Sequence, residues 1–119
     1  YLKHIVINVQ ETDRDTLFTY VSEQAIREIY LKPFEMAIKE GHSMGIMAAK
    51  NRVGNVSAEA NAAVTNSIIR GEWNYKGIVV TDAYSGMACK TVDAMVRSGT
   101  NIPLSVVGKR NNADGTYFL

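Results

Sequence analysis

The chain has 119 residues, of which 46% are hydrophobic and 21% charged, and its formal net charge is +1. This length is typical of one domain with a modest core. The charge balance indicates neither nucleic acid nor an anionic membrane as a partner, and no apolar run approaches the roughly 18 residues of a membrane span. A single cysteine, Cys89, excludes an internal disulfide.

The first part of the chain passes from a short apolar run into a helical pattern. Residues 5–7 indicate the end of a strand, and the polar segment 8–16 is expected to form a loop. Ser22 can cap a helix, Pro33 should kink or split it, and Gly41 should end it. The apolar stripe of this helix is expected to consist of Ala25, Ile26, Ile29, Tyr30 and Ala37.

The middle of the chain repeats this order. Residues 44–49 are apolar and predict a second strand, and residues 51–55 predict a loop. A second helix is expected to begin at Ser57, run to about Arg70 and end at Gly71. Its buried face should consist of Val64, Ile68 and Ile69.

The last part predicts a third strand at 78–81, a third helix at about 87–98 and a fourth strand at 104–107. The polar segment 108–119 predicts a loosely held tail. Strands separated by helices predict an α/β fold with parallel strands. A closed eight-unit barrel takes about 250 residues, so the chain supplies about three to four units. We interpret it as a piece of a barrel; the alternative is a small open sheet.

The β-branched run of the third strand ends in a carboxylate, Asp82. A residue at this position is aimed by a rigid strand and surrounded by a loop, which suits a catalytic group. From the residues alone, a helix cap or a turn residue is the simpler interpretation of Asp82.

Four segments carry a resemblance to a known family. They are Lys3-His4 with the following 8–14, the helix segment 22–35, the strand end 47–51, and 69–83, which contains Arg70, Glu72, Trp73 and Asp82. In this order and at this spacing they resemble the barrel domain of family 3 glycoside hydrolases, the β-glucosidase group. The resemblance covers roughly residues 1 to 105. It implies a partial TIM (β/α)8 barrel, with residues 1–107 as part of the catalytic barrel.

The resemblance also implies roles for individual residues. Asp82 is expected to be the nucleophile of a retaining hydrolase, which forms a glycosyl-enzyme intermediate. Lys3 and His4 are expected to bind sugar hydroxyls, for which their donor and acceptor groups are suited. Met47 is expected to line the sugar pocket, and Arg14 to have a structural role. No cofactor is expected, and the spacing of His4 and His42 predicts no metal site.

Three positions depart from the family pattern. Ala83 replaces an aromatic residue after the nucleophile, Lys50 replaces a tyrosine, and Asn101 replaces the aspartate of a Gly-Thr-Asp motif. The three departures bear on substrate preference, and the first two on the rate of turnover. The general acid of the family comes from a following domain or a distant loop, and no residue here matches it.

The expected function is therefore hydrolysis of terminal β-linked glucose-like sugars by the parent enzyme, with this chain inactive alone. The expected partners are a β-glucoside or oligosaccharide substrate, the remainder of the barrel, and a following domain that supplies the acid. Alternatives are a non-catalytic module that forms a homo-oligomer through sheet edges, and a carbohydrate-binding remnant.

Overall fold

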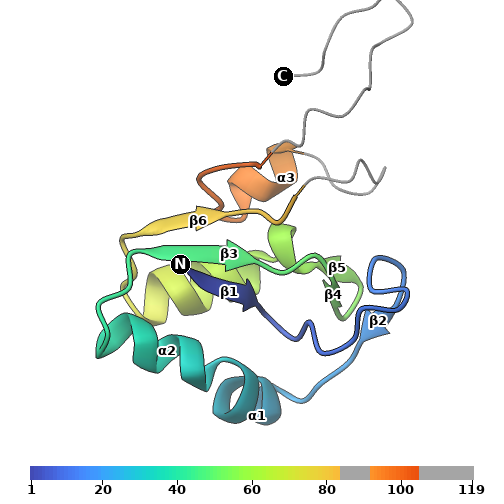
Figure 1. The fold of residues 1–119 in the computed structure, drawn as a ribbon, viewed down its shortest axis with the longest axis horizontal. Helices are drawn as coiled ribbons and strands as arrows, with labels where there is room; N and C mark the ends of the chain where they lie inside the picture. Colours follow the sequence, from blue (N-terminus) through green and yellow to red (C-terminus); the bar gives the residue numbers. More distant parts are fainter. Residues whose placement is uncertain (84–91, 105–119) are drawn as a thin grey trace, which may run out of the picture.

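A computed structural model of the chain describes residues 1–83 and 92–104. Its central element, sheet A, consists of β1 (Leu2–Ile5), β3 (Gly45–Ala48) and β6 (Ile78–Val80) in the order β1-β3-β6 (Figure 1). Both pairings in this sheet are parallel, which confirms the predicted parallel arrangement. The carboxyl ends of the three strands therefore meet at one edge of the sheet.

Residues 5–7 were expected to be the end of the first strand, and β1 (Leu2–Ile5) ends at the first of them. Residues 5–7 are all buried, at 2%, 0% and 5% exposure. The carbonyls of Val6 and Ile7 accept hydrogen bonds from the side chain of Asn51 (both 3.1 Å) and not from a neighbouring strand. Val6 and Ile7 therefore form a buried turn after Ile5, the last residue of β1, because a side chain provides the hydrogen bonds that a strand ladder would otherwise provide.

The helical segment that follows has three pieces: α1 (Glu23–Ala25), the π-helix η1 (Ile26–Tyr30) and α2 (Lys32–Lys39). Ser22 Oγ accepts a hydrogen bond from Ala25 N at 3.2 Å, as the predicted cap should. Pro33 lies in the first turn of α2, where its missing N–H removes no helical hydrogen bond. The predicted split of this helix near the proline is confirmed.

The prediction that Ile29 belongs to the apolar stripe is wrong, because its side chain is exposed, at 62%. In the π-helix, Leu31 N donates to the carbonyl of Ile26 five residues earlier. This wider turn rotates later side chains away from the positions of an ideal α-helix. Leu31, at 1% exposure, enters the core together with Ile26.

The segment that was expected to be a loop at 51–55 contains part of a hairpin. It pairs β4 (Arg52–Val53) antiparallel with β5 (Val56–Ser57), and β2 (Phe18–Thr19) adds parallel to β4 to form sheet B. Ser57 therefore ends a strand and precedes only a short 3₁₀ turn, and the predicted long helix begins later. Figure 1 shows sheet B beside the carboxyl ends of sheet A.

A 3₁₀ turn, η2 (Ala58–Ala60), leads into the second helix, which is the π-helix η3 (Ala63–Glu72). Asn61 caps it, since its Oδ1 accepts from Val64 N at 3.2 Å. The helix passes through Gly71, the predicted end. Its predicted buried face is confirmed, with Val64, Ile68 and Ile69 at 4%, 8% and 0% exposure.

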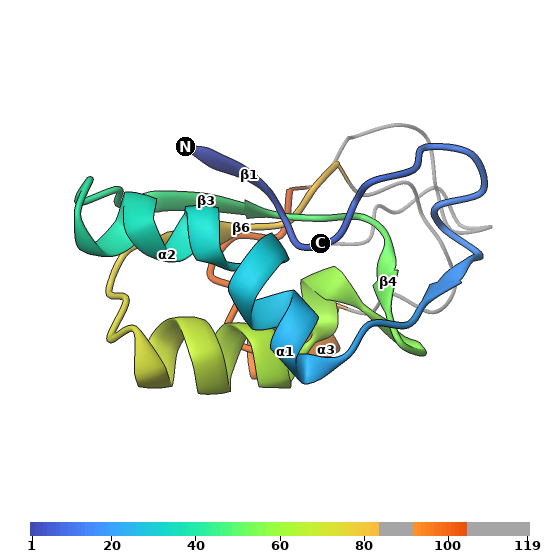
Figure 2. The same cartoon turned by 90° about the horizontal axis from the view of Figure 1, so that it is seen from below.

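The described helices α1, α2 and η3 lie on the same face of sheet A (Figure 2). Trp73 belongs to the core between the sheet and these helices. The Arg27 guanidinium joins two of the helical segments through paired hydrogen bonds to Glu72, at 2.7 and 2.9 Å. These bonds hold the pKa of Glu72 below its ordinary value.

The third helix, α3 (Val92–Arg97), confirms the described part of the helix that was predicted at about 87–98. Residues 87–91 of that prediction, residues 105–107 of the fourth strand and the tail 108–119 lie outside the described residues. In the part of the chain that the structure describes, no helix is long and apolar enough to cross a bilayer.

Candidate active site at the carboxyl edge of sheet A

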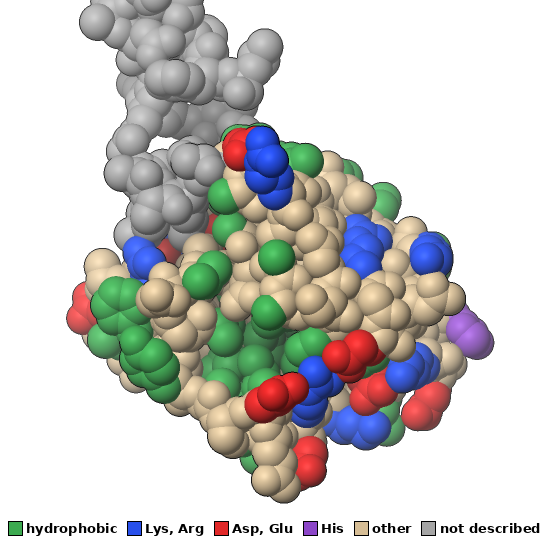
Figure 3. Space-filling view, turned by 180° about the vertical axis from the view of Figure 1, so that it is seen from behind, with side chains coloured by type: hydrophobic (Ala, Val, Ile, Leu, Met, Phe, Trp, Pro, Cys, Tyr) green, Lys and Arg blue, Asp and Glu red, His purple; other side chains and the backbone are tan. Residues whose placement is uncertain are grey.

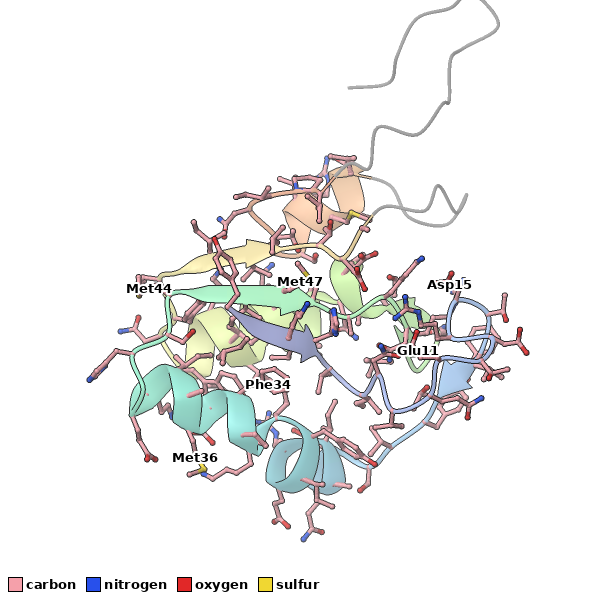
Figure 4. The ribbon with its side chains drawn as sticks, viewed as in Figure 1. Glu11, Asp15, Phe34, Met36, Met44 and Met47 are labelled. Atoms are coloured by element: carbon pink, nitrogen blue, oxygen red, sulfur yellow. The ribbon has the colours of Figure 1, made fainter. Side chains whose placement is uncertain are left out.

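The predicted site residues come from three neighbouring strands. His4 is on β1, Met47 is on β3, and Asp82 follows the last residue of β6 by two positions. Because the strands are parallel, their carboxyl ends bring residues from distant parts of the chain to one edge. Figure 4 shows Met47 on the central strand, with Glu11 and Asp15 in the loop region beyond the end of β1.

The Asp82 carboxylate has a different neighbour at each oxygen. Oδ1 accepts a hydrogen bond from Ala83 N at 2.6 Å, and Oδ2 lies 4.0 Å from His4 Nε2. The two side chains are 15% and 30% exposed, so both are partly shielded and still accessible. A distance of 4.0 Å is too long for a hydrogen bond, so the contact is electrostatic when His4 is protonated.

The two other predicted residues, Lys3 and Met47, lie on β1 and β3 of sheet A. Lys3 precedes His4 on β1 and is exposed, and the peptide bond between them is cis. Met47 is half-buried and lies opposite Val80, two residues before Asp82. The structure thus brings His4 and Asp82 together, with Met47 on the strand between theirs.

Residues of the loop after β1 take part in two ion pairs. Lys50, at the position of the family's tyrosine, has its Nζ 3.6 Å from Asp15 Oδ2. Arg14 Nη1 donates to Glu11 Oε1 at 3.0 Å, and Asn8 Nδ2 donates to the same oxygen. Arg14 therefore pairs within the loop, and its structural role stays a prediction.

Asn51 is a residue whose role was missed from the sequence. It is 3% exposed, and its Nδ2 donates to the carbonyls of Val6, Ile7 and Arg52. It thereby connects the segment after β1 to the segment after β3. The signal that could have indicated this role is a carboxamide shortly after a buried apolar strand.

Two surface cavities lie elsewhere on the described part of the chain, and neither is lined by His4 or Asp82. One, of about 270 Å³, is formed by Leu31, Ile68 and Trp73 with charged side chains that include Arg27 and Glu72. Figure 3, seen from the helix side, shows an apolar hollow bordered by acidic and basic side chains. The charged groups of this cavity pair with one another. They are therefore already neutralised and do not indicate a ligand.

The other cavity, of about 300 Å³, lies between the loop after β1 and β2, and Asn51 is among its lining residues. The exposed Phe18 and Tyr20 border it. Within the described residues, no group of three or more His, Cys, Asp or Glu side chains could hold a metal ion.

Comparison with known proteins shows the family of this chain. Residues 2–109 match the model of the glycosyl hydrolase family 3 N terminal domain. Beta-glucosidase B of Emericella nidulans is 44% identical over 94 residues, which are 79% of this chain and 11% of that protein. A beta-glucosidase of Rhizobium radiobacter is 33% identical over 94 residues, which are 78% of this chain and 12% of that protein.

Solved structures show the same fold. A beta-glucosidase from Paenibacillus barengoltzii superposes with a TM-score of 0.82 at 39% identity, covering 87% of this chain and 12% of that one. Beta-glucosidase 3B from Thermotoga neapolitana, solved in complex with glucose, gives 0.79 at 36% identity, covering 90% and 14%. The chain thus spans a small part of the length of these relatives, which confirms that its strands are a piece of a larger α/β barrel domain. The chain belongs to glycosyl hydrolase family 3, as part of the N-terminal domain.

Proposed function

We propose that the protein containing this chain hydrolyses terminal β-linked glucose-like sugars with retention of configuration, and that Asp82 is its nucleophile. The observation that supports this most strongly is the Asp82 carboxylate at the carboxyl edge of a parallel sheet, 4.0 Å from His4. The relatives that share the fold and sequence are named beta-glucosidases, which favours a hydrolase over a non-catalytic or purely sugar-binding module.

The first chemical step is attack of an Asp82 oxygen on the anomeric carbon, with departure of the aglycone oxygen. Oδ2 is the better placed oxygen, because Oδ1 already accepts the Ala83 N–H and is held in place by it. A water molecule then attacks the same carbon from the side that the aglycone has left, which releases Asp82 and retains the configuration.

The basic residues of β1 bind the sugar in this proposal. His4 donates to or accepts from a hydroxyl beside the reacting carbon, and Lys3 donates to a second hydroxyl. Met47 lines the pocket from β3, which lies between β1 and β6. A part of the full-length enzyme outside this chain provides the general acid that protonates the leaving oxygen. The isolated chain is therefore expected to hydrolyse a glycoside very slowly.

The proposal is tested by Asp82→Asn in the full-length enzyme, assayed for release of an aryl β-glucoside. Loss of the nucleophile should lower kcat by about 10³-fold or more. Asp93→Asn is the matched control, because Asp93 is an exposed aspartate of α3 that pairs with Arg97. If Asp82→Asn releases the aryl group as fast as Asp93→Asn does, the assignment is wrong.

A further inference from the structure

Strand β6 is held on its outer side by the segment 99–104, which follows α3. Asn101 N and Ile102 N both donate to Val79 O, at 2.9 and 3.2 Å, and Thr81 N donates to Ile102 O at 3.0 Å. On its inner side, β6 pairs with β3. The strand that leads to Asp82 is therefore fixed between a strand and this segment.

One side chain of the segment, that of Asn101, contacts β6 directly. Its Oδ1 accepts a hydrogen bond from Val79 N at 2.9 Å. Since Asn101 N donates to Val79 O, the same residue satisfies both backbone groups of Val79. Asn101 is thus a two-point clamp on the middle residue of β6.

Arg70 of η3 holds this clamp in place. Its Nη2 donates to Asn101 Oδ1 and, at 3.0 Å, to Gly99 O. Its Nη1 donates to Gly77 O at 2.8 Å, directly before β6 begins. One guanidinium therefore connects the start of β6 with the segment that borders it.

We propose that Asn101 is a positioning residue for the nucleophile, which acts by fixing β6 through Val79. The inference rests on the proposed function of Asp82, which lies three residues beyond Val79. A strand advances about 3.3 Å per residue, so even a partial slip of β6 would move Asp82 farther than nucleophilic attack tolerates.

This role differs from the expectation that the change at position 101 bears on substrate preference. The Asn101 carbonyl is directed to Arg70 and Val79, and accepts from both. An aspartate, the residue of the family motif, could accept the same two bonds. Asn101→Asp should therefore preserve the clamp, and Asn101→Ala should remove it.

The test uses the full-length enzyme and pre-steady-state release of the aryl group from an activated aryl β-glucoside. The burst rate reports attack by Asp82, and the burst amplitude reports the fraction of competent enzyme. Asn101→Ala should lower the burst rate 10- to 100-fold, with glucose binding changed less than 2-fold. Asn101→Asp should stay within 3-fold of the parent rate. Arg70→Lys, which keeps the charge and loses the planar fork, should lower the rate if Asn101→Ala does not fold.

Asn66→Ala is the matched control, because Asn66 Nδ2 also donates to a backbone carbonyl nearby, that of Arg97 at 2.9 Å. It should leave the burst rate unchanged. A loss of amplitude at an unchanged rate in Asn101→Ala, or an equal loss of rate in Asn66→Ala, would overturn the inference. Failure of the proposed function is recognised separately, since Asp82→Asn would then retain the burst.

Discussion

His4 Nε2, on the first strand of sheet A, lies 4.0 Å from Asp82 Oδ2, which follows the third strand, and β3 lies between the two strands. The two residues lie far apart in the sequence. The parallel order of the sheet creates the pair, because it aligns the carboxyl ends of strands that are separated by helices.

His4→Ala should lower kcat/KM for an aryl β-glucoside about 10- to 100-fold, since it removes a hydrogen-bonding group beside the reacting carboxylate. Steady-state kinetics of the full-length enzyme measure this effect. His42→Ala is the control, because His42 is exposed and follows α2 near the opposite end of the sheet. Equal kcat/KM values for the two variants would show that His4 does not contact the substrate.

Ala83→Trp should restore the aromatic residue that the family has directly after its nucleophile. Ala83 is half-buried and donates its N–H to Asp82, so a ring attached there starts beside the site. Stacking against a sugar should lower KM about 3- to 10-fold. Ala62→Trp, at an exposed position before η3, provides the comparison. A KM that rises in Ala83→Trp alone would mean that Ala83 makes room for the substrate.

Glu72→Gln should remove a pH-dependent contribution to stability. Hydrogen bonds from Arg27 hold the Glu72 pKa below its ordinary value, so the stabilisation is present above the unfolded-state pKa of about 4.3. It is lost as the pH falls through the lower folded-state pKa. In urea unfolding of the full-length enzyme, the free energy of unfolding of the parent should therefore exceed that of Glu72→Gln most at neutral pH. The two values should converge between about pH 5 and pH 3.

Glu28→Gln is the control for this effect, because Glu28 accepts from the neutral amide of Gln24 at 3.2 and 3.3 Å. Its stability difference from the parent should change little over the same range. A gap between the parent and Glu72→Gln that stays constant down to pH 3 would contradict the role of the Arg27 pair.

Asn51→Ala should destabilise the protein by about 1–3 kcal/mol, since it leaves the buried carbonyls of Val6 and Ile7 without their donor. Urea unfolding of the full-length enzyme measures the loss. Asn55→Ala is the comparison, because Asn55 is exposed and its backbone carbonyl, not its side chain, accepts from Arg52. Similar free energies of unfolding for the two variants would show that Asn51 does not hold the segment after β1.

The parallel sheet and the position of Asp82 could be predicted because they depend on strong patterns. The β-branched run before Asp82 is too short for a helix, and the helical stretches between strands require parallel connections. Buried positions of η3 followed from spacing, as Val64, Ile68 and Ile69 show.

Other features depend on tertiary contacts and carry little local signal. Ile29 lies in a π-helix and is exposed. A π-helix contains the same residue types as an α-helix, so the sequence alone did not indicate the wider turn. The hairpin of β4 and β5 has strands of two residues, which are too short to show alternation. The clamp formed by Asn101 could not be predicted from the sequence, because it depends on where the fold places both Arg70 and Val79.

The central claim is that Asp82 forms the covalent bond to the sugar. The most direct measurement is mass spectrometry of peptides from the full-length enzyme after reaction with an activated 2-deoxy-2-fluoro-β-glucoside, which slows hydrolysis of the glycosyl-enzyme. We predict that the sugar mass appears on the peptide that contains Asp82, at that residue. A sugar attached to a different carboxylate, with the Asp82 peptide unmodified, would contradict the account.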